Sequence, residues 1–179
     1  LTDKCQYNYK EFYESASILD VAKKIGYKTY WFSNQGRYGQ FDSAITMVAK
    51  TADEAEWTDD SYNFTTKYDE SLLPYLTRID PKANNFVVLH LMGSHIYYNN
   101  RYPDTWAKFT SAPGDSAATS APSYANSILY TDHILSEIFA YAEKNLNLRA
   151  MIYFSDHGED LQISHNPDVF KFDMVHIPM

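Results

Sequence analysis

The stretch NNFVVLHLMGSH, residues 84–95, decides the fold class. Residues 86–92 are almost continuously apolar and include β-branched side chains. This pattern is typical of a central parallel strand whose two faces are both covered. The stretch then ends in Gly93, Ser94 and His95, so polar side chains follow the point where the strand should stop.

The segments before this strand run in the order helix, glycine, strand. Residues 15–26 predict a helix that Ser15 or Ser17 can cap and that Gly26 ends. The strand YKTYWFSN, residues 27–34, follows directly, and this rhythm indicates an α/β unit. Further patterns predict a helix at 42–52, a short strand at 53–57, and a helix at 69–79 with Pro74 in its first turn.

The segments after the strand repeat the pattern on a larger scale. Residues 111–123 are small, polar and interrupted by Pro and Gly, which predicts a mobile loop. Residues 124–146 predict a long helix, and RAMIYFSD, residues 149–156, predicts another buried strand. We therefore expect an α/β fold: a three-layer sandwich with a mainly parallel central sheet.

Composition limits the class of function. The chain has 179 residues, 45% of them hydrophobic, which suits a folded domain with a real core. Its net charge of −8 argues against nucleic acid as a partner, because phosphate binding needs clustered Lys and Arg. Cys5 is the single cysteine, so an internal disulfide is impossible. Both ends of the sequence look like cuts within a larger protein, and no apolar run is long enough for a membrane span.

Polar side chains collect where the predicted strands end. Asn34 follows one strand, His95 the next, and Asp156 and His157 the last, with His165 shortly after them. In such a sheet, ligands bind beyond the carboxyl ends of the strands. Carboxylate and imidazole donors together suit a divalent metal, zinc above all, with Mn²⁺ as an alternative. Gly158 would let the backbone turn sharply under the metal.

Structural interpretations stand beside these. Asp156 could instead cap a turn. His133 falls within the long predicted helix and suits a packed or solvated position, and His176 lies on the last apolar run and suits the core. His90 lies inside the strand and suits a supporting or core role better than direct metal binding.

Three ordered blocks carry a family resemblance: FVVLHLMGSHIYYNNRYP (86–103), SYANSILYTDHILSEIF (123–139) and YFSDHGED (153–160). Together they resemble the phosphoethanolamine transferases of bacterial envelopes, in the sulfatase branch of the alkaline phosphatase superfamily. The upstream stretch at 15–36 is similar to the same family, so the resemblance covers nearly the whole chain. It implies that residues 1–179 are part of a single sulfatase-like catalytic domain truncated at both ends.

The resemblance also implies roles for individual residues. Asp156 and His157 match the family's zinc ligands. His95 and His165 match histidines that line the phosphoethanolamine pocket, act in catalysis and can hold a second zinc.

Three further positions match substrate-binding residues. Asn34 lies where family members place a polar phosphate-contacting residue, and Arg37 and Glu159 are further candidates. The family's nucleophile is a Thr, and another acidic zinc ligand also lies upstream. We expect both to precede this chain, because no matching motif surrounds Thr2.

The implied activity is a zinc-dependent transfer of phosphoethanolamine from phosphatidylethanolamine, through a phospho-threonine intermediate, to lipid A or a core sugar of lipopolysaccharide. The parent would be an inner-membrane protein with this domain in the periplasm, held to the membrane by a missing N-terminal segment. The present residues alone are expected to be inactive. Alternatives are a sulfatase, although Cys5 lacks the required motif, a phosphoglycerol transferase, or a non-catalytic binding module.

Overall fold

The computed structural model describes residues 2–4, 7–8, 10–11, 14–39, 42–59, 67–116, 118–163 and 168–177. The chain divides into two compact units. The first comprises residues 1–92 and 144–147, and the second comprises residues 93–143 and 148–179.

A parallel sheet forms the centre of the first unit. Its strands are β1 (Lys28–Ser33), β2 (Glu54–Trp57) and β3 (Asn85–His90), in the order β2-β1-β3. Ser33 lies opposite Trp57 on one side and His90 on the other, so all three strands end at the same edge. The expected parallel sheet is confirmed.

The order of the strands differs from the expectation in one respect. β1 is the central strand and is buried at five of its six positions. Within the described part of the chain, β3 pairs with β1 alone, and all its residues are only half-buried. An apolar run in the sequence indicates that a strand is partly covered, but it does not indicate which strands lie beside it.

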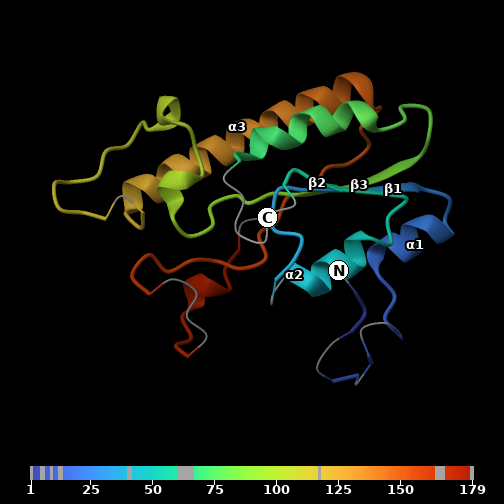
Figure 1. Ribbon diagram of the computed structural model, residues 1–179, viewed down its shortest axis with the longest axis horizontal. Helices are drawn as coiled ribbons and strands as arrows, with labels where there is room; N and C mark the ends of the chain where they lie inside the picture. The colour runs from blue at the N-terminus through green and yellow to red at the C-terminus, as the bar shows by residue number, and fades with distance from the viewer. Residues whose placement is uncertain are drawn as a thin grey trace. The chain divides into compact units, whose positions relative to one another are not determined.

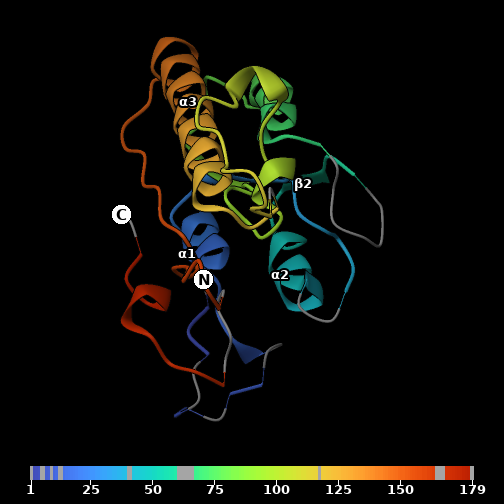
Figure 2. The same ribbon diagram turned by 90° about the vertical axis from the view of Figure 1, so that its left-hand side faces the viewer.

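Two helices cover one face of the sheet: α1 (Ile18–Lys24) and α2 (Asp42–Ala49) (Figure 1 and Figure 2). Ser17 caps α1 in a reciprocal arrangement with Asp20, which decides between the two proposed caps. Buried residues from both helices, β1 and β2 form the core on this face: Leu19, Trp31, Val48, Ala49 and Trp57.

The opposite face is covered by η2 (Asp69–Arg78) (Figure 1). Alternate side chains of β1 point to opposite sides of the sheet, so each face receives its own set of side chains from this strand. The rings of Phe32 and Tyr75 lie 5.2 Å apart there. The expected helix is present, but it is a 3-10 helix with Pro74 in its interior rather than in its first turn. Pro74 has no N–H for an α-helical hydrogen bond, and its ring disfavours an α conformation in the residue before it.

The second unit contains most of a long helix, α3 (Ala121–Asn145), which confirms the predicted helix. Its apolar buried side chains recur every fourth residue and belong to Tyr130, Ile134, Ile138 and Ala142. The apolar residues Ile128 and Phe139 of the predicted helical pattern are each 46% exposed and lie outside this buried face. The unit also contains short 3-10 turns, η3 (Tyr98–Asn100), η4 (Asp104–Trp106) and η5 (Phe172–Met174).

The predicted strand at 149–156 is wrong for this structure. Residues 151–155 have no regular secondary structure, and Ile152 and Phe154 are 77% and 53% exposed. Apolarity shows that a segment gains free energy from being covered. A strand also needs a neighbouring backbone to accept and donate its hydrogen bonds.

A buried carboxylate fastens the carboxyl edge of the sheet. Asp69, only 6% exposed, accepts hydrogen bonds at Oδ1 from the Asn34 amide and from the backbone N–H of Met92, both at 2.8 Å. Asn34 in turn accepts a hydrogen bond from the Thr58 hydroxyl. One side chain of η2 therefore joins the segments that follow β1 and β3.

We expect Asp69→Ala to lower the free energy of unfolding by about 2 kcal/mol, because it leaves two buried donors without their acceptor. Asp69→Asn should cost less, since its amide oxygen can accept both hydrogen bonds. Urea-induced unfolding measures the difference, and Glu70→Ala at the exposed neighbouring position is the control. Equal stability of the Asp69→Ala and Glu70→Ala proteins would contradict this account.

Candidate functional site

The segments after β1 and β3 meet, as the sequence predicts. Ser33 Oγ lies 3.1 Å from His90 Nδ1, and Gln35 Nε2 donates to the Leu91 carbonyl at 2.6 Å. The His90 ring also meets the Trp31 ring edge-on, with centroids 5.6 Å apart. His90 is therefore held in a supporting position.

Asn34 lies at this edge but is fully buried. Its Nδ2 donates to the Lys67 carbonyl and to Asp69, and its Oδ1 accepts from Thr58. Direct contact with a phosphate was the expectation. The observed contacts commit the side chain to holding the strand ends together, because both its amide atoms are used within the protein.

Arg37 places a positive charge near the same edge. Its guanidinium carbon lies 4.8 Å from the centre of the Trp57 ring at the end of β2, and 5.5 Å from the Tyr38 ring. The aromatic faces attract and orient the cation. An oriented guanidinium suits the recognition of a phosphate.

Asp156 and His157 lie side by side in the second unit, with Asp156 Oδ1 3.9 Å from His157 Nε2. His157 Nδ1 lies 2.8 Å from the Gly158 carbonyl. A carbonyl can only accept, so Nδ1 carries the proton and Nε2 of the neutral ring carries the lone pair. Metal-bound histidines commonly have this arrangement.

These two residues fit zinc in the kind of donor they offer. The Asp156 side chain is 86% exposed and the His157 side chain 35% exposed, so both can be reached. Neighbouring donors around tetrahedral zinc lie about 3.3 Å apart, which needs only a small approach of the two groups. The described residues contain no group of three or more potential protein ligands, and His165 lies outside them.

Gly158 is needed for a reason that the sequence did not reveal. Its N–H donates to the Met174 carbonyl at 2.8 Å, so η5 lies directly against it. A Cβ on Gly158 would lie 1.9 Å from the Asp173 carbonyl oxygen. We expected Gly158 to allow a sharp turn. The structure instead requires glycine there because the backbones of Gly158 and Asp173 approach each other closely.

An ion pair reinforces this packing. Lys171 Nζ contacts Asp160 Oδ2 at 2.6 Å. The hydrogen bond from Lys171, and then the hydrogen bond from the Gln162 amide, hold the pKa of Asp160 below its ordinary value. The segment that contains η5 is thus fastened to the residues that follow His157.

His95 lies in a tightly constrained loop. Gly93 and Tyr97 both have left-handed backbones, with φ of 56° and 65°. Arg101, only 8% exposed, donates from Nε to the His95 carbonyl at 3.2 Å and from Nη2 to the Ile96 carbonyl at 3.1 Å. The sequence analysis did not identify Arg101, although the sequence shows this Arg six residues after the candidate residue His95.

Glu159 is half-buried in the second unit, and its Oε1 is a buried atom. Burial, and then the charge of Glu159, raise the pKa of Tyr98 and also that of Tyr124. The expectation that Glu159 binds substrate stays a prediction.

Two other histidines also have structural surroundings. His133 stacks on Trp106 with ring centroids 4.5 Å apart, which confirms a packed helical position. His176 is exposed beside Phe172, so its expected place in the core is wrong. Asn126, which the sequence analysis did not single out, accepts hydrogen bonds from the N–H groups of Lys108 and Phe109 and holds that loop to α3.

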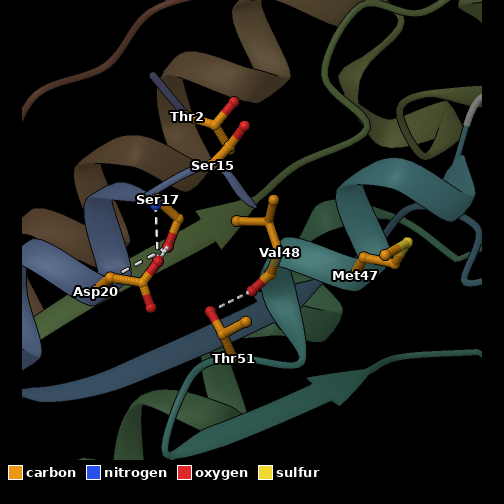
Figure 3. Close-up of a pocket in the computed structure, with 7 residues that line it drawn as sticks. All are labelled: Thr2, Ser15, Ser17, Asp20, Met47, Val48 and Thr51. Carbon is orange, nitrogen blue, oxygen red and sulfur yellow. Dashed lines mark hydrogen bonds between the residues drawn. The ribbon is translucent and has the colours of Figure 1, made fainter. Parts of the chain in front are cut away.

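A hollow of about 230 Å³ lies between α1 and α2 (Figure 3). Its polar side chains are used locally: Ser17 and Asp20 cap α1, and Thr51 donates to the Val48 carbonyl at 2.7 Å. The hollow contains none of the residues that the sequence singled out for chemistry at strand ends.

Comparison with known proteins places the chain in a family. Residues 2–179 match the family model described as Sulfatase. The chain belongs to the sulfatase family. This sulfatase-family chain is similar to phosphoethanolamine transferase EptC of Escherichia coli strain K12, at 30% identity over 81% of the chain and 27% of the relative. It is also similar to phosphoethanolamine transferase OpgE of the same strain, at 32% identity over 79% of the chain and 27% of the relative.

Solved structures agree with this placement. The zinc complex of the C-terminal periplasmic domain of E. coli EptC aligns with a TM-score of 0.68 at 30% identity, over 86% of this chain and 45% of that one. The corresponding domain of EptC from Campylobacter jejuni aligns with the same TM-score at 27% identity, over 89% and 53%. The resemblance to phosphoethanolamine transferases and the expected sulfatase-like α/β fold are both confirmed.

The chain spans about a quarter of the length of the two curated relatives named above. Among the helices of the described residues, none combines the length and the apolar character that crossing a membrane requires.

Gly158→Ala should lower the free energy of unfolding by about 2 kcal/mol, because the new methyl group overlaps a backbone carbonyl that cannot rotate away. Gly114→Ala is the control for a Cβ in open space: a Cβ there meets nothing within 4 Å, so this variant carries only the backbone strain of placing alanine at a φ of 97°. Thermal unfolding of both variants measures the cost. A smaller loss for Gly158→Ala than for Gly114→Ala would show that η5 does not press against Gly158.

Proposed function

We propose that this chain is part of the catalytic domain of a zinc-dependent phosphoethanolamine transferase. The donor would be phosphatidylethanolamine, and the acceptor lipid A or a core sugar of lipopolysaccharide. The observation that carries the proposal is the similarity to named phosphoethanolamine transferases along about four-fifths of the chain.

The proposed location follows from the same relatives. The similar solved structures are described as C-terminal periplasmic domains. We place this domain in the periplasm, as part of a longer inner-membrane protein in which another segment provides the membrane anchor.

Asp156 and His157 would hold the zinc together with ligands from the longer protein. The zinc complex of the similar EptC domain supports this choice of metal. When bound, zinc supplies a positive charge that lowers the pKa of a hydroxyl nucleophile and draws electron density from a phosphoryl oxygen. The Gly158 carbonyl holds the His157 proton on Nδ1, so Nε2 is the nitrogen that can face a cation.

The transfer would take place in two displacements. A Thr oxygen of the longer protein attacks phosphorus, the bond from phosphorus to the diacylglycerol oxygen breaks, and that oxygen takes up a proton. A hydroxyl or phosphate oxygen of the acceptor then attacks the same phosphorus. The bond to Thr breaks, and the Thr oxygen recovers its proton.

Histidines would move the protons in these steps. His95 and His165 would bind the phosphoryl group or protonate a leaving oxygen. Arg101 keeps the His95 backbone in place through its carbonyl. Arg37, already oriented by Trp57, would offer a positive charge to the phosphate.

A zinc titration tests the metal part of the proposal. The 179-residue chain should bind zinc weakly or not at all, because Asp156 and His157 provide only half of a tetrahedral ligand set. The longer protein should bind it tightly and lose that binding in His157→Ala. Calorimetry measures both. Tight stoichiometric zinc in the 179-residue chain, lost in His157→Ala, would mean that the local ligand set is more complete than proposed.

Histidine variants test the reaction. In the longer protein, His95→Ala and His165→Ala should each lower transfer by roughly 10²-fold, the scale of losing an acid-base or electrostatic partner. His133→Ala is the control and should change transfer only a few-fold, because this ring stacks on Trp106. The assay is transfer from a labelled phosphatidylethanolamine analogue, with thermal melting to check folding. Equal damage by His133→Ala at unchanged stability would place the cleft elsewhere.

A further inference from the structure

Two side chains of the loop at 93–101 reach the same backbone oxygen. The His95 ring has its Nδ1 3.5 Å from the Ile96 carbonyl oxygen, and Arg101 donates from Nη2 to that oxygen at 3.1 Å. Arg101 also donates from Nε to the His95 carbonyl at 3.2 Å. A carbonyl oxygen has two lone pairs and can only accept, so it serves both donors and favours a proton on His95 Nδ1. The lone pair of the neutral ring is then on Nε2.

The backbone around His95 needs to be held by other groups. Gly93 and Tyr97, on either side of it, have left-handed φ of 56° and 65°. Tyr97 carries a Cβ, so this conformation is strained and persists only where surrounding contacts determine it. Residues 93–97 belong to no helix or strand, so no ladder of backbone hydrogen bonds supplies those contacts. The two bonds from Arg101 close the loop instead.

Arg101 is itself firmly anchored. It is 8% exposed and directly follows η3, where its backbone N–H donates to the Tyr98 carbonyl at 3.0 Å. The Tyr98 ring meets the Tyr124 ring of α3 edge-on, with centroids 5.0 Å apart. The hydroxyl of Tyr102, the next residue, accepts a hydrogen bond from the Asn126 amide of α3 at 3.3 Å. Contacts with α3 therefore fix the chain on both sides of Arg101.

A guanidinium suits this position because of its shape. Its nitrogens lie in one plane at fixed separations, so a single group can bind two consecutive carbonyls. The ammonium group of lysine is a compact point charge on a flexible stem, and it cannot make both bonds with the same geometry. Arginine here therefore fixes the orientation of two peptide groups, in addition to supplying a charge.

We propose that Arg101 is a positioning residue for His95: by binding the His95 and Ile96 carbonyls with one guanidinium, it fixes the loop backbone and the ring nitrogen that carries the proton. The catalytic consequence rests on the proposed function, in which His95 acts on the transferred phosphoryl group. The competing role is direct binding of a phosphate by Arg101. Its burial and its two bonds to backbone carbonyls favour positioning.

Nitrogen NMR of the His95 ring in the longer protein tests positioning without any activity. Histidine labelled with ¹⁵N shows which ring nitrogen is protonated, and His95→Ala identifies the signals of this ring. In the unmodified protein the neutral ring should carry its proton mainly on Nδ1. Arg101→Lys keeps a positive charge but loses the two fixed donors, so it should raise the share of rings protonated on Nε2 several-fold. Arg149→Lys, at an exposed arginine in the same unit, is the matched control and should leave the ring unchanged.

Each result of the NMR experiment decides the proposal. A proton found mainly on Nε2 in the unmodified protein, or an unchanged ring in Arg101→Lys, would overturn it. Loss of folding in Arg101→Lys, measured by thermal melting against Arg149→Lys, would also overturn it, because Arg101 would then stabilise the unit as a whole rather than the placement of His95.

Transfer kinetics then separate positioning from phosphate binding. Under positioning, Arg101→Lys should lower kcat about tenfold with KM nearly unchanged, a smaller loss than that expected for His95→Ala itself. The double variant should transfer no more slowly than His95→Ala, because the guanidinium acts through this ring. Direct binding of phosphate would instead raise KM and slow transfer further in the double variant, and that pattern overturns the proposal. An unmodified protein that transfers no phosphoethanolamine refutes the proposed function, while the NMR experiment still decides the role of Arg101.

Discussion

Ser33 and Asn34 at the carboxyl end of β1 find their hydrogen-bond partners inside the protein, because this strand is buried on both faces. Tyr30, Trp31 and Phe32 are at most 1% exposed, and burial continues through Ser33 and Asn34. Water cannot satisfy groups in such a place, and an unmet donor or acceptor there costs about 1–3 kcal/mol. The rest of the first unit is arranged around this requirement. β2 and β3 pair with the backbone of β1, and η2 supplies Asp69.

This requirement limits which polar residues at the sheet edge remain for chemistry. Asn34 and His90 both lie at this edge, and their side chains hold the strand ends together. The sequence indicated a supporting role for His90 and a phosphate contact for Asn34. Arg37 differs in that its guanidinium lies over the rings of Trp57 and Tyr38. A planar guanidinium suits the recognition of a phosphate, so Arg37 stays a candidate for that contact.

The second unit holds its candidate residues by a different means. Residues 93–97 and 156–160 lie outside regular secondary structure, so no ladder of backbone hydrogen bonds holds them. Their positions depend on individual contacts instead: Arg101 to the His95 carbonyl, Met174 to the Gly158 amide, and Lys171 to Asp160. Loops fixed in this way can present side chains outward while their backbone stays in place. Asp156, 86% exposed beside a closely packed glycine, illustrates the result.

The sequence by itself determined the local features and the family. The cap at Ser17, the end of α1 at Gly26, the parallel strands at 28–33 and 85–90 and the long helix all depend on residues a few positions apart. The blocks around His95 and Asp156 identified the family for the same reason, since they are continuous stretches. Tertiary structure alone decided that β1 is central, that Asn34 binds Asp69 at 35 positions' distance, and that Gly158 makes room for η5. It also left residues 151–155 without a place in the sheet. These outcomes depend on which distant segments meet, and periodicity along the chain carries no information about that.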